Sequence, residues 1–264
     1  MPLKTALRKM GMTAEPTEPA ATAPPAKILA VDIGGTKVKI LVSGETEPRK
    51  ATSGKRFTPA KMVDVVQELA HGWDYEAVSI GFPGLVGDHG PRSEPGNLGS
   101  GWVGFNFAAA FGKPVRIIND AAMQALGSYE GGRMLFLGLG TGLGSTLIVQ
   151  NVIIPLELGN LLYANGEKLG TVLGRRGLQQ LGKEPWRAAV RDVVAAFTDA
   201  FIADYIVIGG GNAKRLKEPP PGARLGHNLT AFRGGFRLWT MVDVPTLSAD
   251  QMATTGTPAG WRVI

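Results

Sequence analysis

The sequence predicts a mixed α/β protein of two similar lobes, and a repeated strand pattern is the main reason. In residues 28–42 and again in residues 134–149, an apolar strand leads into a glycine-rich turn with threonine and then into a second apolar strand. Two copies of one hairpin indicate two lobes of the same design. A length of 264 residues is enough for two lobes with a cleft between them.

Further elements follow from local patterns. Strands are predicted at residues 77–80, 115–118 and 205–208, because short apolar runs there are bounded by turn residues. A helix is predicted over residues 121–129, with Asn119 or Asp120 as its N-cap. A second, amphipathic helix is expected to start at Pro185 and reach Phe201. Residues 81–104 and 217–222 are rich in glycine or proline and should be irregular.

These elements divide the chain into four parts. Residues 1–26 contain no apolar core of signal-peptide length and are rich in Glu, Thr, Ala and Pro, so we expect a disordered leader. Residues 27–118 should form the N-terminal lobe and residues 119–239 the C-terminal lobe. Residues 240–264 form the remaining C-terminal tail.

Composition limits the classes of function. The sequence has no cysteine, which excludes disulfides and thiolate zinc sites and fits a reducing compartment. No apolar run approaches the roughly 20 residues of a membrane-spanning helix. We therefore expect a cytoplasmic protein without a membrane partner.

The positive net charge of +6 is confined to one region. Residues 27–174 hold 13 basic and 13 acidic residues, whereas residues 175–237 hold 11 basic and 5 acidic ones. This basic stretch is either a solvated face or a surface for an anionic ligand, and the sequence leaves both open.

Three glycine turns each follow a predicted strand: Gly34–Gly35–Thr36, Gly140–Thr141–Gly142 and Gly209–Gly210–Gly211. Glycine lets the backbone approach a ligand closely, so that exposed N–H groups can bind phosphate oxygens while a threonine hydroxyl adds a donor. A tight hairpin turn explains any one of them equally well. Their combination with Asp32 and with Asn119–Asp120, in this order, is more specific.

Seven segments in this order resemble the ROK family of sugar kinases (repressor, open reading frame, kinase), in the superfamily of hexokinases, actin and heat-shock ATPases. They are residues 31–37 (VDIGGTK), 80–84 (IGFPG), 95–98 (PGNL) with 101–104 (GWVG), 118–120 (IND), 139–142 (LGTG), 157–159 (ELG) and 207–211 (VIGGG). The resemblance implies a two-lobed actin-like (ribonuclease H-like) fold with a cleft between the lobes. The chain is most similar to the polyphosphate glucokinase branch in two features, the sequence of residues 155–159 and the absence of the cysteine zinc motif.

The resemblance implies a glucokinase-type phosphotransferase, which moves a phosphoryl group from polyphosphate or ATP to the 6-hydroxyl of glucose or a related hexose. Asp120 would be the general base, although it could also be a plain helix cap. Asn97, Asn119, Glu157 and Asn160 would bind the sugar. Glu157 is flanked by apolar residues, and a carboxylate in so apolar a surrounding needs partners.

On the donor side, the resemblance implies that Asp32 holds Mg²⁺ through water, although a simple turn aspartate is the alternative. The phosphates or nucleotide would be bound by the three glycine turns together with Lys37. No zinc is expected.

The match departs from the family at two positions. Asn160 stands where members usually have histidine, and Gln180 stands about where zinc-binding members have a sugar-binding glutamate. Losing a charged contact to a hydroxyl costs about 1.5 to 3 kcal/mol, so a weakened or silent sugar-binding homologue is the alternative function. A DNA-binding repressor is not expected, because the proline-rich segment before the first strand cannot form a helix-turn-helix. The oligomeric state is left open between a monomer and a homodimer.

Overall fold

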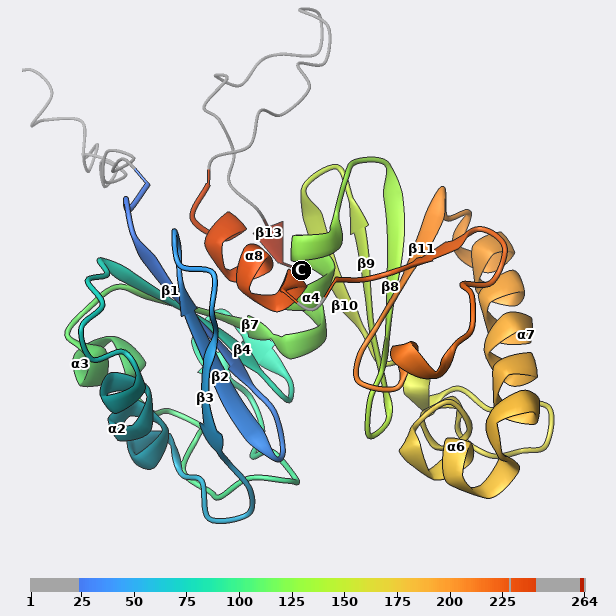
Figure 1. The fold of residues 1–264 in the computed structure, drawn as a ribbon, viewed down its shortest axis with the longest axis horizontal. Helices are drawn as coiled ribbons and strands as arrows, with labels where there is room; N and C mark the ends of the chain where they lie inside the picture. Colours follow the sequence, from blue (N-terminus) through green and yellow to red (C-terminus); the bar gives the residue numbers. More distant parts are fainter. Residues whose placement is uncertain (1–23, 228, 241–261, 264) are drawn as a thin grey trace, which may run out of the picture.

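The computed structural model describes residues 24–227, 229–240 and 262–263, and it contains two large β-sheets side by side (Figure 1). Most of the predicted leader and most of the predicted tail lie outside the described residues. The first sheet has the order β3-β2-β1-β4-β7 and the second the order β12-β11-β8-β9-β10-β13.

The strands of the first sheet are β1 (Ile28–Ile33), β2 (Lys37–Val42), β3 (Arg49–Thr52), β4 (Ala77–Phe82) and β7 (Val115–Asn119). Those of the second are β8 (Arg133–Leu139), β9 (Leu143–Val149), β10 (Val152–Leu156), β11 (Tyr205–Gly209), β12 (Ala223–Leu225) and β13 (Arg262–Val263).

The two sheets share one design, as the repeated hairpin predicts. In the first, β1, β2 and β3 are antiparallel neighbours while β4 and β7 run parallel to β1. In the second, β8, β9 and β10 repeat the antiparallel part, and β11 and β12 repeat the parallel part. The prediction of two actin-like lobes is therefore confirmed, with β13 added at the edge of β10.

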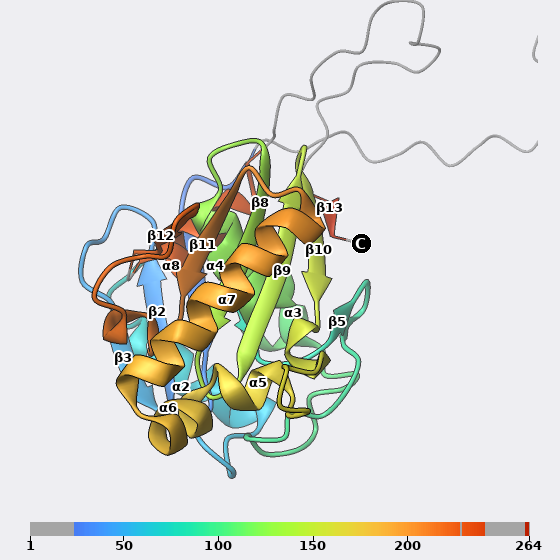
Figure 2. The same ribbon diagram turned by 90° about the vertical axis from the view of Figure 1, so that its right-hand side faces the viewer.

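Helices cover the outer face of each sheet (Figures 1 and 2). Helices α2 (Pro59–Leu69) and α3 (Phe107–Phe111) pack on the first sheet, where Met62 and Trp102 are fully buried against the strands. Helices α5 (Leu169–Val172), α6 (Arg175–Leu181) and α7 (Lys183–Phe201) lie on the second. There Trp186 and Val190 of α7 are buried with the apolar residues of β8.

Helices α4 (Asp120–Ser128) and α8 (Thr230–Arg237) lie between the two sheets (Figure 1). Their backbones touch, because a Cβ atom on Gly127 would lie 1.8 Å from Thr230 O and one on Gly234 would lie 1.8 Å from Met123 O. Helix α8 also reaches the first sheet, where Ser79 Oγ donates a hydrogen bond of 2.6 Å to Gly235 O. Helix α8 therefore contacts both lobes, although the predicted boundaries assign it to the second.

The other predicted elements are found with small shifts. The helix expected from Pro185 begins at Lys183, which places the proline in the first turn, where its missing N–H costs little. The loop over residues 81–104 contains a short hairpin of β5 (Val86–Gly87) and β6 (Gly90–Pro91). Residues 217–222 are irregular, as predicted. In the described part of the chain, no helix is long and apolar enough to cross a membrane.

Candidate active site

Asp32 lies near the end of β1, directly before the first glycine turn. Strand pairing sets it opposite Lys39 of β2, whose Nζ is 3.2 Å from Asp32 Oδ2. The Asp32 side chain keeps 16% of its surface exposed, so the carboxylate can still meet a ligand. Lys39 was missed from the sequence, although the alternation of Lys37, Val38 and Lys39 in a hairpin offered a signal.

The first turn presents backbone donors beside this carboxylate. Gly34 N donates to Lys37 O at 3.0 Å, and Ser53 Oγ donates to Gly34 O at 2.6 Å. Within the described residues, the N–H groups of Gly35 and Thr36 donate no hydrogen bond. Two free amides at a tight turn suit the oxygens of a phosphate.

Asp120 is the first residue of α4, and Asn119 caps this helix. Asn119 Oδ1 accepts hydrogen bonds from Ala121 N and Ala122 N at 2.9 and 3.1 Å, while Asn119 Nδ2 donates to Gly84 O at 3.1 Å. Asp120 Oδ1 accepts a bond of 2.8 Å from Ala121 N, which leaves Oδ2 available. The predicted N-cap is thus Asn119, so the Asp120 carboxylate is oriented at the cleft end of the helix.

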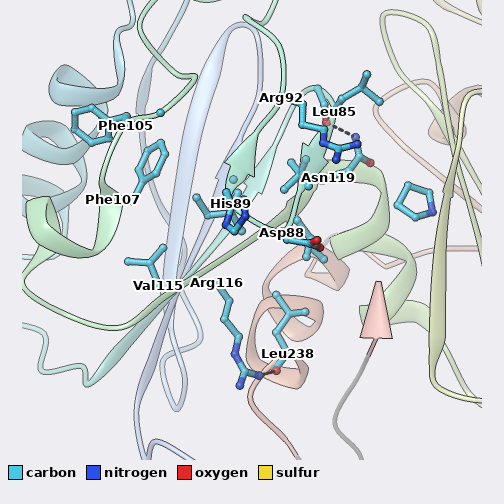
Figure 3. Close-up of a pocket in the computed structure, with 18 of the residues that line it drawn as sticks. Leu85, Asp88, His89, Arg92, Phe105, Phe107, Val115, Arg116, Asn119 and Leu238 are labelled. Carbon is cyan, nitrogen blue, oxygen red and sulfur yellow. Dashed lines mark hydrogen bonds between the residues drawn. The ribbon is translucent and has the colours of Figure 1, made fainter. Parts of the chain in front are cut away.

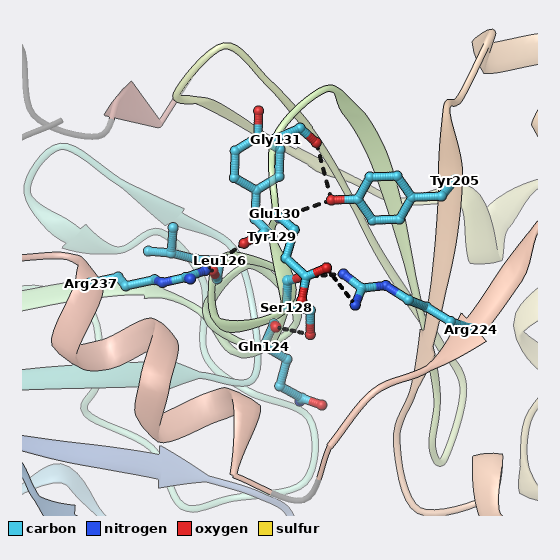
Figure 4. A network of polar contacts seen from close by, with 9 residues as sticks. All are labelled: Gln124, Leu126, Ser128, Tyr129, Glu130, Gly131, Tyr205, Arg224 and Arg237. Carbon is cyan, nitrogen blue, oxygen red and sulfur yellow. Dashed lines mark hydrogen bonds and ion pairs between the residues drawn. The ribbon is translucent and has the colours of Figure 1, made fainter. Parts of the chain in front are cut away.

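The far end of α4 is fixed by two arginines (Figure 4). Arg237 Nη1 donates to Leu126 O and to Tyr129 O, both at 2.7 Å, and Arg224 Nη2 donates to Ser128 O at 2.7 Å. Arg224 is also paired with Glu130 at 2.9 Å. Cations on the last carbonyls stabilise a helix end, so Asp120 stands on a firmly held element.

Burial, together with the charge of the nearby Asp32 carboxylate, raises the pKa of Asp120 to about 7. The charge of Glu157 adds to this effect, whereas the hydrogen bond from Ala121 N lowers the pKa. A carboxyl group with a pKa near 7 is suited to accept a proton at neutral pH. Asp120 lies close to Asp32, because Gly81 pairs with Asp32 in the sheet and a Cβ atom on Gly81 would lie 3.5 Å from Asp120 Cα.

This pKa predicts a loss of stability on raising the pH. The folded protein holds the Asp120 proton up to about pH 7, whereas the unfolded chain releases it near its ordinary pKa of 3.8. The folded state therefore binds more protons between these values, so its stability falls as pH rises through this window. We expect the free energy of unfolding of Asp120→Asn, relative to that of wild type, to rise by up to about 2.7 kcal/mol between pH 5 and pH 7, at most about 1.36 kcal/mol for each pH unit. Urea unfolding of both proteins at pH 5 and pH 8 measures this, and equal pH dependence in both would contradict it.

Glu157 and Asn119 meet at a cavity of about 1160 Å³ that runs along β7 (Figure 3). Asn119 lies on one side of this cavity, and Phe105 and Phe107 lie on the other. The Glu157 side chain is exposed at the edge, after the last residue of β10. Glu157 is less enclosed than its apolar neighbours suggested, because Leu158 is buried in the core, whereas Pro155 and Leu156 line the cavity with Glu157.

Asn160 and Asn97 lie near this site in different ways. Asn160 N donates to Glu157 O at 3.0 Å, and Asn160 Oδ1 accepts a bond of 3.0 Å from Lys168 Nζ. Asn97 is outside the cavity lining and packs on the first glycine turn, where a Cβ atom on Gly35 would lie 2.4 Å from Asn97 Nδ2. Gln180 is an exposed residue of α6, also outside this lining.

On the opposite lobe, the second and third glycine turns are joined to each other. Asn212 N donates to Leu139 O at 2.9 Å, and Asn212 Nδ2 donates to Gly140 O at 2.8 Å. Gly210 has φ +82°, and a Cβ atom there would lie 2.5 Å from Leu139 O, so only glycine fits. Asn212 was missed from the sequence, although it directly follows the third turn.

Beside these turns lies a second cavity of about 430 Å³ with three basic side chains. It is lined by Arg175, Leu178, Gln179, Gly182, Lys183, Asn212 and Arg215. Arg175 N donates to Gly140 O at 3.1 Å, which fixes the cavity next to the second turn.

Among the 11 basic residues of 175–237, two sets differ in how their side chains are paired. The side chains of Arg187, Lys217, Arg224 and Arg237 bind carbonyls or carboxylates of the protein. By contrast, the side chains that line the second cavity, Arg175, Lys183 and Arg215, form no hydrogen bond or ion pair among the described residues. Three unpaired cations around one cavity favour an anionic ligand there.

The described residues fit a magnesium ion that is held through one carboxylate and water. No group of three or more acidic or histidine side chains that could hold a metal occurs among the described residues. Mg²⁺ usually keeps several waters and takes one or two carboxylates together with substrate phosphates. Asp32, part-exposed beside the first turn, is suited to such a role.

The two lobes share one strand order, both carry glycine turns, and a carboxylate stands at the start of the helix between them. Together these features define the actin-like class of sugar kinases. Within this class, the model of the ROK family matches residues 28–157 of the chain.

Two curated relatives are kinases acting on different sugars. Polyphosphate glucokinase of Mycobacterium tuberculosis is 26% identical over 212 residues, which cover 72% of this chain and 80% of that protein. Kanosamine kinase of Amycolatopsis mediterranei is 27% identical over 255 residues, covering 73% of this chain and 83% of the relative. The crystal structure of inorganic polyphosphate/ATP-glucomannokinase from Arthrobacter sp. strain KM superposes with a TM-score of 0.66 at 23% identity, covering 81% of this chain and 97% of that one. This structural likeness supports the fold.

Proposed function

We propose that this sugar kinase transfers a phosphoryl group from polyphosphate, or from ATP, to the 6-hydroxyl of glucose or a related hexose. The observation that carries the proposal is the position of Asp120 as the first residue of α4, where the charges of Asp32 in the N-terminal lobe and Glu157 in the C-terminal lobe help to raise its pKa. Phosphoryl transfer asks a protein mainly to position the reactants, neutralise charge and accept the alcohol proton.

The acceptor sugar would lie against Asn119, Asp120, Glu157 and Asn160. Asp120 Oδ2 would hydrogen-bond the attacking hydroxyl and accept its proton late in the reaction. Glu157 accepts hydrogen bonds from hydroxyls, and Asn160 Nδ2 donates to them, because Asn160 Oδ1 is engaged by Lys168. Asn119 chiefly orients the helix, since its oxygen and nitrogen are both bonded within the protein.

The donor would lie between the glycine turns of the two lobes. The free amides of Gly35 and Thr36 and the turn at Gly140–Thr141–Gly142 would bind its phosphates, with Lys37 and Lys39 nearby. Mg²⁺, when held by Asp32 through water, would neutralise donor charge. We favour polyphosphate over ATP, because the cavity beside the second turn is basic and contains no aromatic side chain.

A silent sugar-binding protein is the second candidate, and Asn160 and Gln180 motivate it. Against it, the raised pKa of Asp120 destabilises the fold at neutral pH, a cost that a pure binder has no reason to carry. A cytoplasmic location is part of the proposal, since a chain without cysteine suits a reducing compartment.

The direct test is to incubate the purified protein with glucose, Mg²⁺ and either polyphosphate or ATP. We expect glucose 6-phosphate to form with at least one donor, measured by a coupled dehydrogenase assay. Absence of product with glucose, mannose and their N-acetyl derivatives, while these sugars still bind in calorimetry, would favour the silent protein instead.

A further inference from the structure

Lys168 is a cation bonded to Asn160, one of the residues proposed to bind the acceptor sugar. Its Nζ donates a 3.0 Å hydrogen bond to Asn160 Oδ1, and it forms no ion pair with any residue that the structure describes. An exposed lysine usually extends into water, since holding its flexible side chain costs entropy. Lys168 differs, because its ammonium group is bonded to Asn160, whose backbone N–H donates to Glu157 O.

The loop that carries Lys168 is anchored at both ends. Leu169 N donates to Leu161 O at 2.8 Å, and Leu162 bridges Lys168 in an antiparallel pair. At the base of the loop, a Cβ atom on Gly170 would lie 3.2 Å from Gly159 O. At its tip, Tyr163 OH donates to Asp192 Oδ2 of α7 at 3.0 Å. The fold therefore holds the backbone at Lys168, and Asn160 holds its ammonium group.

The charges around the acceptor site indicate how Lys168 would discriminate between neutral sugars and amino sugars. The carboxylate of Glu157, and that of Asp120 where it is ionised, would attract a sugar that carries a positive amino group. Lys168 opposes this attraction and offers further N–H donors to a sugar oxygen. Arg92 and Arg116 also line the cavity at Glu157, but of these three described cations Lys168 is the one bonded to Asn160.

We propose that Lys168, held by Asn160, is a specificity-determining residue that binds an oxygen of the acceptor sugar and selects against amino sugars. This inference rests on the proposed function, since it assumes that the sugar lies between Asp120 and Asn160.

The test compares glucose with glucosamine, at a pH where the amine is charged, in wild type and in Lys168→Met. Methionine keeps the length of the side chain and removes its charge. We expect wild type to have a higher kcat/KM for glucose than for glucosamine. In Lys168→Met the ratio of these two values should fall about fivefold, because one near-surface charge is removed. The change should appear in KM, with kcat for glucose nearly unchanged. Lys61→Met on α2, an exposed lysine away from the cleft, is the matched control and should behave as wild type.

A second variant tests whether Asn160 acts through the lysine. Asn160→Ala should weaken the preference in wild type but should add no further change to Lys168→Met, since coupled residues are not additive. A preference altered by less than twofold in Lys168→Met, or an equal rise of KM for both sugars, would overturn the proposal.

Calorimetric binding of glucose and glucosamine to the same variants separates this inference from the proposed function. If no donor supports turnover but the binding preference still shifts in Lys168→Met, the kinase assignment fails and the role of Lys168 stands. If neither sugar binds to wild type, the inference is wrong.

Discussion

Replacing Asp120 by Asn should reduce kcat for sugar phosphorylation by about 10²- to 10⁴-fold, the usual contribution of a positioned general base. The amide keeps the shape of the side chain, and its oxygen can still accept the hydrogen bond from Ala121 N. It cannot accept a proton from the sugar hydroxyl. The KM for the sugar should change little, because the loss concerns a step that follows binding.

Asp64→Asn is the matched control, since Asp64 is exposed on α2 and far in the sequence from any site residue. It should retain the wild-type kcat. Steady-state kinetics near pH 8, where wild-type Asp120 is ionised, gives the clearest comparison. An Asp120→Asn protein that keeps more than about a tenth of wild-type kcat would rule out the general-base role.

The pattern along the chain was enough to predict the two lobes, because it depends on local sequence. Each hairpin has an apolar strand, glycines at the turn and another apolar strand, and a second copy of this unit cannot easily arise by chance. The same locality explains why Asn119 was predicted as a cap. An asparagine directly before a helical pattern carries its structural role in its neighbours.

The contacts between distant segments were not predictable in this way. The crossing of α4 and α8 depends on Gly127 and Gly234, which are far apart in the sequence and become informative only when the helices meet. Asn212 and Lys168 are similar cases, because each acquires its role from a partner on another segment. The exposure of Glu157 depends on where β10 ends, which its apolar neighbours did not reveal.

The basic charge excess is another feature that the sequence locates without showing which of its residues are paired. Counting residues located it between residues 175 and 237, but the count could not say which cations are already paired. In the structure, Arg224 and Arg237 hold the end of α4, whereas Arg175, Lys183 and Arg215 surround a cavity. Of these two sets, the second keeps its charged groups free for a ligand.

Changing Arg175, Lys183 and Arg215 together to Gln should raise the KM for polyphosphate about 30-fold, since each cation neutralises one phosphate and releases its counterion. These side chains line the cavity beside the Gly140 turn, and they form no ion pair in the described structure that would be lost. The KM of wild type should also rise steeply with salt, and the triple variant should respond less. ATP, bound mainly by turn amides and Mg²⁺, should show a weaker salt dependence.

The matched control is Arg191→Gln combined with Arg233→Gln, two exposed arginines on α7 and α8 that lie outside the cavity lining. It lowers the net charge of the same region without touching the cavity. If the two sets of substitutions raised the KM for polyphosphate equally, the donor would be attracted by the overall positive charge of the region and not by a defined site. If activity required ATP, or if the KM for polyphosphate ignored both salt and the triple substitution, the cavity would be a solvated basic surface. The donor would then have to be bound by the glycine turns alone.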